Sequence, residues 1–123
     1  MLLEQFGVRV RDLRAARRFY VAIAGALGLV IIDVSPTSFM IGRAAAKPVP
    51  ILRIAGGPRS DEEDGAPVHF AFTASDPDSV DRFHRAAIAA GGTDNGGPGI
   101  RGDGYSALAI DPDGNVIEVG LRG

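Results

Sequence analysis

Two stretches of the chain share one pattern of apolar and polar positions, and each predicts a strand followed by a helix. The first stretch alternates over Gln5–Val10, and the second is largely apolar over Val68–Ala74. A period of two is typical of a strand that buries one face. Helix starts follow at Asp12 and Asp76, because a carboxylate there can accept hydrogen bonds from free backbone N–H groups. The helices expected after them are Leu13–Ala26 and Pro77–Ala90.

Short strand candidates follow each expected helix. In the first half they are Leu29–Val34, Ser38–Ile41 and Ile51–Ile54; in the second they are Tyr105–Ile110 and Asn115–Leu121, with a weak signal between Thr93 and Arg101. Asp111-Pro112-Asp113-Gly114 predicts a hairpin, because proline presets one φ and glycine allows a positive φ. The order βαβββ therefore occurs twice, which predicts an α+β fold with one helix covering one face of each sheet.

The two halves resemble each other in sequence as well as in pattern. Laid 64 residues apart, Phe6–Gly28 and Phe70–Gly92 share seven identical residues, which indicates an internal duplication. We expect one domain, residues 1–123, with modules at about 4–54 and 67–121. The duplication gives each residue a counterpart, and His69 corresponds to Gln5.

Composition narrows the classes of partner. The net charge is −2 and the lysines and arginines do not cluster on one face, so a nucleic-acid partner is not expected. The longest apolar run, Tyr20–Ile32, is shorter than the roughly 20 residues needed to span a bilayer, so no membrane segment is expected. The absence of cysteine excludes disulfides and thiolate metal sites, and it fits a reducing cytoplasm.

Strand periodicity assigns one face of each strand to a cleft opposite the helix. The apolar residues of each strand are placed on the helix side, and the remaining ones face the cleft. On this assignment small residues leave volume and a few polar groups converge, as a small-molecule pocket requires. The expected cleft residues are Gln5, Gly7, Arg9, His69, Ala71, Thr73, Tyr105, Ala107, Ala109, Val116, Glu118 and Gly120.

Each polar residue of this set has a chemical and a structural interpretation. His69 and Glu118 form a metal-ligand or general-base pair, or a plain hydrogen bond. Arg9 grips an anionic substrate group through its planar fork, or is a surface arginine. Tyr105 donates a proton or only lines the pocket. His84 is expected on the second helix, at its surface or in a packing role.

The segments "FGVRVRDLRAARRFY", "HFAFTASD" and Asp111–Glu118 resemble the vicinal oxygen chelate superfamily, which includes glyoxalases, bleomycin-binding proteins and extradiol dioxygenases; Ala89–Gly99 is similar to a glyoxalase-like branch. The resemblance implies a curved mixed sheet around an open cleft. It also implies divalent-metal ligands on the first and last strands of each module. Carried over, these fall on His69 and Glu118, with Gln5 at a position that is usually histidine. The strand Ile51–Ile54 offers no conventional ligand.

The resemblance implies a divalent-metal-dependent lyase or isomerase that acts on a small oxygenated metabolite. The ligands would be His69, Glu118 and Gln5, which suit Zn²⁺, Ni²⁺, Mn²⁺ or Fe²⁺. Glu118 and Tyr105 would be catalytic, and Arg9 and Tyr105 would bind substrate. The alternatives are a metal-free binding protein of the bleomycin-resistance type, or a scaffold that lost its site. A dioxygenase is less expected, because its facial triad needs a second histidine in the cleft. The resemblance also implies a homodimer.

Overall fold

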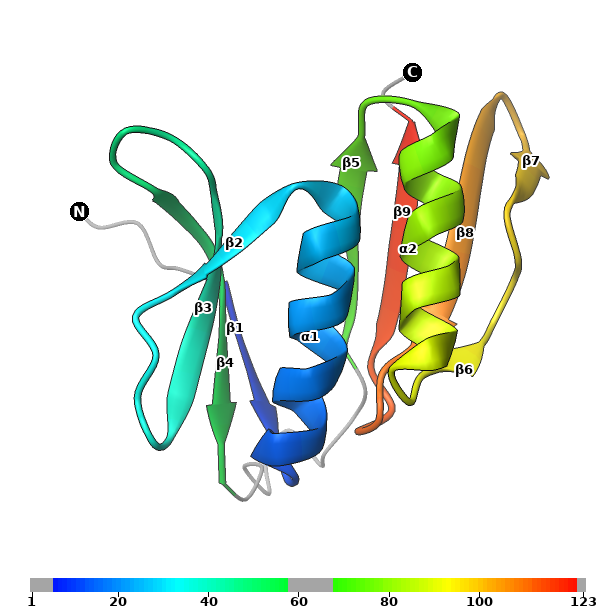
Figure 1. The fold of residues 1–123 in the computed structure, drawn as a ribbon. Helices are drawn as coiled ribbons and strands as arrows, with labels where there is room; N and C mark the ends of the chain where they lie inside the picture. Colours follow the sequence, from blue (N-terminus) through cyan, green and yellow to red (C-terminus); the bar gives the residue numbers. More distant parts are fainter. Residues whose placement is uncertain (1–5, 58–67, 122–123) are drawn as a thin grey trace.

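The computed structural model describes residues 6–57 and 68–121, and it shows the expected order of elements in both halves (Figure 1). The first module contains β1 (Phe6–Val10), α1 (Leu13–Leu27), β2 (Leu29–Ile32), β3 (Ser38–Arg43) and β4 (Val49–Gly56). The second contains β5 (His69–Ala74), α2 (Pro77–Ala89), β6 (Thr93–Asp94), β7 (Gly99–Arg101), β8 (Gly104–Ile110) and β9 (Val116–Leu121). The weak strand signal after the second helix corresponds to β6 and β7. Among these described residues, neither α1 nor α2 has the length and apolar character needed to cross a membrane.

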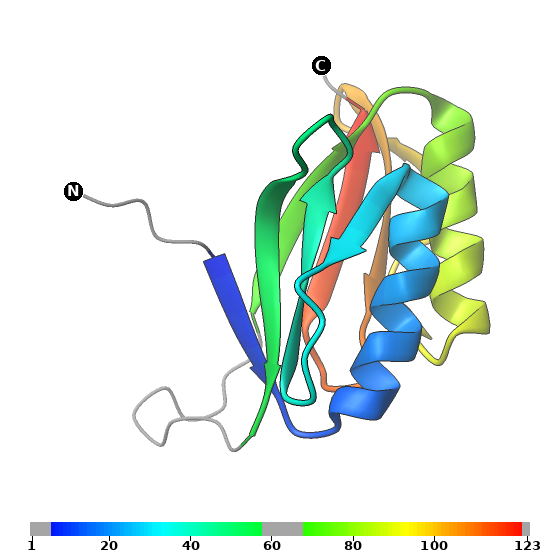
Figure 2. The same cartoon turned by 60° about the vertical axis from the view of Figure 1, so that its left-hand side comes forward.

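The strands form two open, mixed sheets, one from each module. Their orders are β1-β4-β3-β2 and β5-β9-β8-β6, with β7 paired to β8. The first strand of each module runs parallel to the last one, β1 beside β4 and β5 beside β9. Each helix covers one face of its own sheet, and α1 and α2 pack side by side (Figures 1 and 2). The expected α+β fold is therefore confirmed.

The equivalent positions of the two repeats have equivalent structures. Asp12 and Asp76 are the N-cap residues of α1 and α2, and each carboxylate accepts a hydrogen bond from the backbone N–H three residues on. Phe19 and Phe83 are both fully buried. The helix starts predicted from the two aspartates are correct, because this cap satisfies otherwise free N–H groups.

The faces expected for three of the strands are confirmed. Val8 and Val10 of β1 are buried, as are Ile117 and Val119 of β9, while the residues between them point to the other side of each sheet. On β5 the alternation also holds, since His69 and the next odd-numbered residues are exposed. A single hydrophobic core takes side chains from both modules.

The face expected for β8 is wrong. Ala107 and Ala109 are fully buried, and they lie opposite Val119 and Ile117 of β9, on the helix side of the sheet. Leu108 lies opposite Glu118 and shares the open face instead. Among the strands of its sheet, α2 packs mainly on β8. Small side chains allow this close approach of the helix, so alanine rather than leucine faces the core here.

The turn between β8 and β9 fastens the two modules together. Asp111 is only 3% exposed, and its Oδ1 accepts hydrogen bonds from the backbone N–H groups of Asp113 and Asn115. Its Oδ2 accepts one bond from the Asn115 side chain and one, at 2.6 Å, from the Tyr20 hydroxyl on α1. The Asn115 side chain in turn accepts a bond from the backbone N–H of Val68, just before β5. The predicted hairpin is therefore also an anchor for α1.

The Tyr20–Asp111 hydrogen bond predicts a loss of stability in alkaline solution. Burial, and then the Asp111 charge, raise the pKa of Tyr20 well above its ordinary value of 10.0. The unfolded chain therefore loses the phenol proton first as the pH rises above about 10, and this contribution lowers the unfolding free energy by up to about 1.4 kcal/mol per pH unit.

A Tyr20→Phe variant lacks this group, so its unfolding free energy will fall less steeply than that of the wild type between about pH 10 and 11. At pH 7 the variant will be less stable by about 1–3 kcal/mol, because a buried carboxylate loses a donor. Urea unfolding at both pH values measures the two effects. Equal alkaline slopes would contradict the assignment.

The position of Ala107 predicts a second difference in stability. An Ala107→Leu substitution inserts volume between β8 and α2 and will lower the unfolding free energy by about 1–3 kcal/mol. The matched change Ala71→Leu lies on the exposed face of β5 and will alter it by no more than about 0.5 kcal/mol. Urea unfolding of both variants decides the face of β8, because equal losses would place Ala107 on the open side.

Candidate functional site

The open face of the second sheet carries an imidazole–carboxylate pair. His69 is the first residue of β5, and Glu118 lies on β9 directly opposite Ala71. His69 Nε2 is 3.5 Å from Glu118 Oε1. The side chains are 58% and 38% exposed, respectively, so the pair remains accessible to a ligand. The sequence prediction that His69 and Glu118 share one face is confirmed.

The pair has the right donors for a divalent cation but supplies only two of them. A neutral imidazole nitrogen and a carboxylate oxygen are ligands that Zn²⁺, Ni²⁺, Mn²⁺ and Fe²⁺ accept. Within residues 6–57 and 68–121, no three His, Asp or Glu side chains gather closely enough to hold a metal ion. Gln5, the predicted third ligand, lies outside the described residues. His69 and Glu118 therefore fit one half of a metal site.

The strand register identifies the counterpart of Glu118 in the first module. Gly7 corresponds to Ala71 in the repeat, and Gly7 lies opposite Arg53 on β4 just as Ala71 lies opposite Glu118 on β9. Arg53 thus occupies the first-module position that Glu118 occupies in the second. The charge at this position is reversed between the two halves of the molecule.

Arg53 has a second arginine beside it. Arg9 lies on β1 opposite Ala55 of β4, two residues beyond the Gly7–Arg53 pair and on the same face. A cavity of about 270 Å³ is lined by Gly7, Val8, Arg9, Arg53 and Ala55. The sequence prediction singled out Arg9 but did not pair it with Arg53. Periodicity places each arginine on a face, but only the register of β1 on β4 makes them neighbours.

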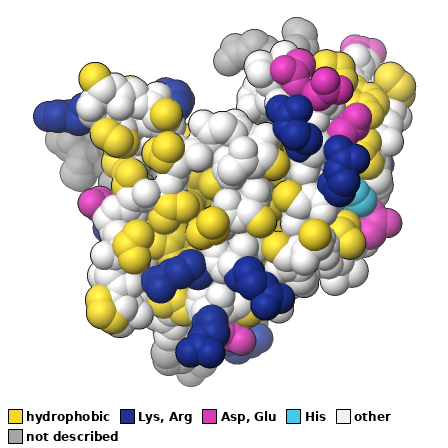
Figure 3. Space-filling model, viewed as in Figure 1, with side chains coloured by type: hydrophobic (Ala, Val, Ile, Leu, Met, Phe, Trp, Pro, Cys, Tyr) yellow, Lys and Arg dark blue, Asp and Glu magenta, His cyan; other side chains and the backbone are white. Residues whose placement is uncertain are grey.

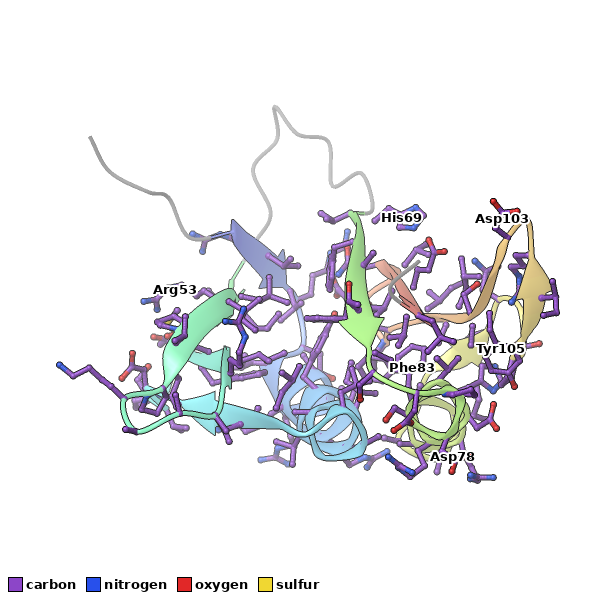
Figure 4. The ribbon with its side chains drawn as sticks, turned by 90° about the horizontal axis from the view of Figure 1, so that it is seen from above. Arg53, His69, Asp78, Phe83, Asp103 and Tyr105 are labelled. Atoms are coloured by element: carbon purple, nitrogen blue, oxygen red, sulfur yellow. The ribbon has the colours of Figure 1, made fainter. Side chains whose placement is uncertain are left out.

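The arginine face and the His69–Glu118 face belong to different sheets. Figure 4 shows both helices on one side of the strands, with Arg53 on the first sheet well apart from His69 at the start of β5. A larger groove of about 870 Å³ lies between the modules, near the end of β5, where Figure 3 shows a hollow in the surface. Its lining residues are Leu27, Leu29, Arg43, Ile51, Ala71, Phe72, Thr73, Ala74, Ser75 and Leu121.

Tyr105 lies on the other side of its sheet. Its hydroxyl donates a 2.6 Å hydrogen bond to Asp81 on α2, and this bond is the main cause of a raised Tyr105 pKa. The expectation that Tyr105 faces the cleft is wrong. Tyr105 and Ala107 share one face of β8, and that face lies on the helix side of the sheet. The structure does not bring Tyr105 together with His69 or Glu118.

His84 lies on α2 as expected, and its side chain is mostly covered. His84 Nε2 is 2.8 Å from Asp94 Oδ1, and Asp94 also accepts a hydrogen bond from the backbone N–H of Gly96. This contact links α2 to β6. The prediction of a surface or packing position for His84 on this helix is confirmed.

Comparisons with known proteins agree with this architecture. A crystal structure of a glyoxalase/bleomycin resistance protein from Albidiferax ferrireducens T118 is 30% identical, with a TM-score of 0.73 and full coverage of both chains. The fosfomycin resistance protein FosX from Mesorhizobium loti is 22% identical with a TM-score of 0.64, and covers 100% of this chain and 95% of its own. The bleomycin resistance determinant encoded on the transposon Tn5 is 18% identical with a TM-score of 0.64, covering 99% and 98% respectively.

The last two similarities show the fold alone, and the comparison with curated proteins finds no match. The family model for the Glyoxalase/Bleomycin resistance protein/Dioxygenase superfamily matches residues 2–119. This match spans both modules and both candidate faces. The chain therefore belongs to the Glyoxalase/Bleomycin resistance protein/Dioxygenase superfamily.

Proposed function

We propose that the protein is a divalent-metal-dependent lyase or isomerase that acts on a small oxygenated metabolite. The observation that supports this proposal is the His69–Glu118 pair, with 3.5 Å between Nε2 and Oε1 on an open strand face. An exposed carboxylate beside an imidazole suits a cation or a transferred proton better than it suits packing. A divalent cation held there supplies Lewis acidity toward a substrate oxygen.

The roles of the two side chains follow from their positions. His69, at the start of β5, binds through its ring nitrogen and fixes one edge of the site. Glu118 is anchored in the middle of β9 and is partly exposed, so its carboxylate can hold a proton that leaves or joins the substrate. Leu108, opposite Glu118, and Ala71 on its other side leave an uncharged surface around the carboxylate.

A homodimer completes the site in this proposal. The outer edges of β1 and β5 have no strand partner among the described residues, and such edges invite pairing with another chain. A second copy that places its first-module face beside the second-module face of its partner would bring a further ligand, for which Gln5 is the candidate. The homodimer and the cytoplasmic location both remain predictions.

A second candidate function is metal-free binding of a small molecule. It is favoured by the first-module face, where arginine occupies the position equivalent to Glu118. It is also consistent with the described residues, which provide two metal ligands and no third. In this case His69 and Glu118 would hydrogen-bond the ligand, and the protein would sequester it unchanged.

Metal content distinguishes the two functions. After incubation with Zn²⁺, Ni²⁺, Mn²⁺ or Fe²⁺ and dialysis, the wild type will retain near-stoichiometric metal by elemental analysis. A variant with His69→Ala and Glu118→Ala will lose it, because both donors are gone. The matched control is His84→Gln, which alters the other His–carboxylate pair and will leave the metal content unchanged.

A Gln5→Ala variant will retain less metal than the wild type if its amide completes the site. A wild type that retains none of the four metals would contradict the metalloenzyme proposal and leave the binding protein. Loss of metal in the His84→Gln variant as well would show that the loss is not specific to the His69–Glu118 pair. Circular dichroism confirms that each variant is folded.

A further inference from the structure

Arg9 and Arg53 of the first module lie beside small residues of the neighbouring strand. Arg53 is opposite Gly7 and Arg9 is opposite Ala55, so each long side chain faces a residue with little or no side chain. The cavity of about 270 Å³ between them is the space that this arrangement leaves. It has room for a few ligand atoms, such as one carboxylate or phosphate group.

The positive charge of this face is not balanced within the described part of the chain. Among residues 6–57 and 68–121, neither Arg9 nor Arg53 forms a salt bridge with a carboxylate. The hydrogen bond that Arg53 makes is to the neutral hydroxyl of Ser38, at 3.1 Å. Two like charges on adjacent strands repel each other, and an anion between them removes the repulsion.

The Arg53 guanidinium is partly held in place. The Arg53 bond to Ser38 engages one Nη atom and leaves its other N–H groups free to donate. The Arg9 guanidinium passes close to Gly57, where a Cβ would stand 3.1 Å from Arg9 Nη1. Because Arg53 is restrained before binding, it loses less side-chain freedom when an anion arrives.

We propose that Arg9 and Arg53 form an anion subsite that binds a carboxylate or phosphate group of the ligand. This inference deepens the proposed function, because it makes the substrate class a small oxygenated anion. It also explains the charge reversal between the repeats: the second module of one copy binds through His69 and Glu118, and the first module of a second copy binds the anionic end of the same molecule. Planar arginine forks suit both kinds of oxyanion.

The test uses anion binding by metal-free protein, so that it does not depend on the metal site. Protein treated with EDTA and labelled with ¹⁵N is titrated with malonate and, separately, with inorganic phosphate at constant ionic strength. The Nε–Hε signals of Arg9 and Arg53 will shift. In the Arg9→Gln and Arg53→Gln variants the dissociation constant of the anion will rise by a factor of about ten or more, because each variant loses charge-assisted hydrogen bonds.

Two control variants separate the effect of the planar arginine side chain at the subsite from the effect of positive charge alone. Arg53→Lys keeps the charge without the planar fork, and its dissociation constant will fall between those of the wild type and Arg53→Gln. Arg85→Gln removes an exposed arginine on α2 and will leave the dissociation constant unchanged. The anion with the lower dissociation constant shows whether the subsite prefers a carboxylate or a phosphate group.

Equal dissociation constants in the wild type, Arg9→Gln and Arg53→Gln proteins would overturn the subsite, as would the absence of binding by either anion. The variant with His69→Ala and Glu118→Ala will bind both anions as the metal-free wild type does. Anion binding by the metal-free protein therefore does not depend on whether the metal proposal holds, and metal retention does not depend on whether the anion subsite exists.

Discussion

The hydrogen bond between the Tyr20 hydroxyl and the Asp111 carboxylate holds the two modules in one arrangement. It joins α1, the helix of the first module, to the turn that carries β8 and β9 of the second. The neighbouring bond from the backbone N–H of Arg11 to the Asp113 carboxylate ties the start of the same helix to the same turn. Because Asp111 is buried, its charge requires the Tyr20 hydroxyl and the N–H donors of its own turn, and the register of the turn follows from them.

This anchor also separates structural from functional roles in the motif Asp111–Glu118. The segment Asp111–Glu118 contains the anchoring turn at one end and the candidate ligand Glu118 at the other. The side chains of Asp111 and Asn115 are committed to hydrogen bonds inside the fold. Of the acidic residues in the motif, only Glu118 faces the open side of the sheet with His69.

Most of the fold could be predicted because its signals are local. The caps at Asp12 and Asp76 mark the helices, and alternation sets the faces of β1, β5 and β9. The face of β8 could not be predicted, since large apolar residues usually face the core, whereas the close approach of α2 requires Ala107 and Ala109 there. The pairing of Arg9 with Arg53 depends on the register of two strands far apart in sequence, which periodicity does not contain.

The two repeats have diverged at matching positions into opposite chemistries. Arg53 and Glu118 have equivalent places in their sheets, and their faces lie apart within one chain. If one ligand uses both faces, a second copy of the chain must bring them together, because the faces lie apart within one chain. The proposed cation-binding half of one copy then meets the proposed anion-binding half of the other. In that case each interface site would combine the metal ligands of one copy with the arginines of the other, and the arginines would bind the anionic ligand.

The most direct measurement mixes two defective chains. Chains with Arg53→Gln and chains with both His69→Ala and Glu118→Ala are unfolded and refolded together, and malonate binding is measured in the presence of Zn²⁺. If each site joins the first module of one copy to the second module of the other, random pairing gives about a quarter of the sites both sets of residues and wild-type affinity. A mixture that binds only as the sum of its two defective components would contradict this arrangement.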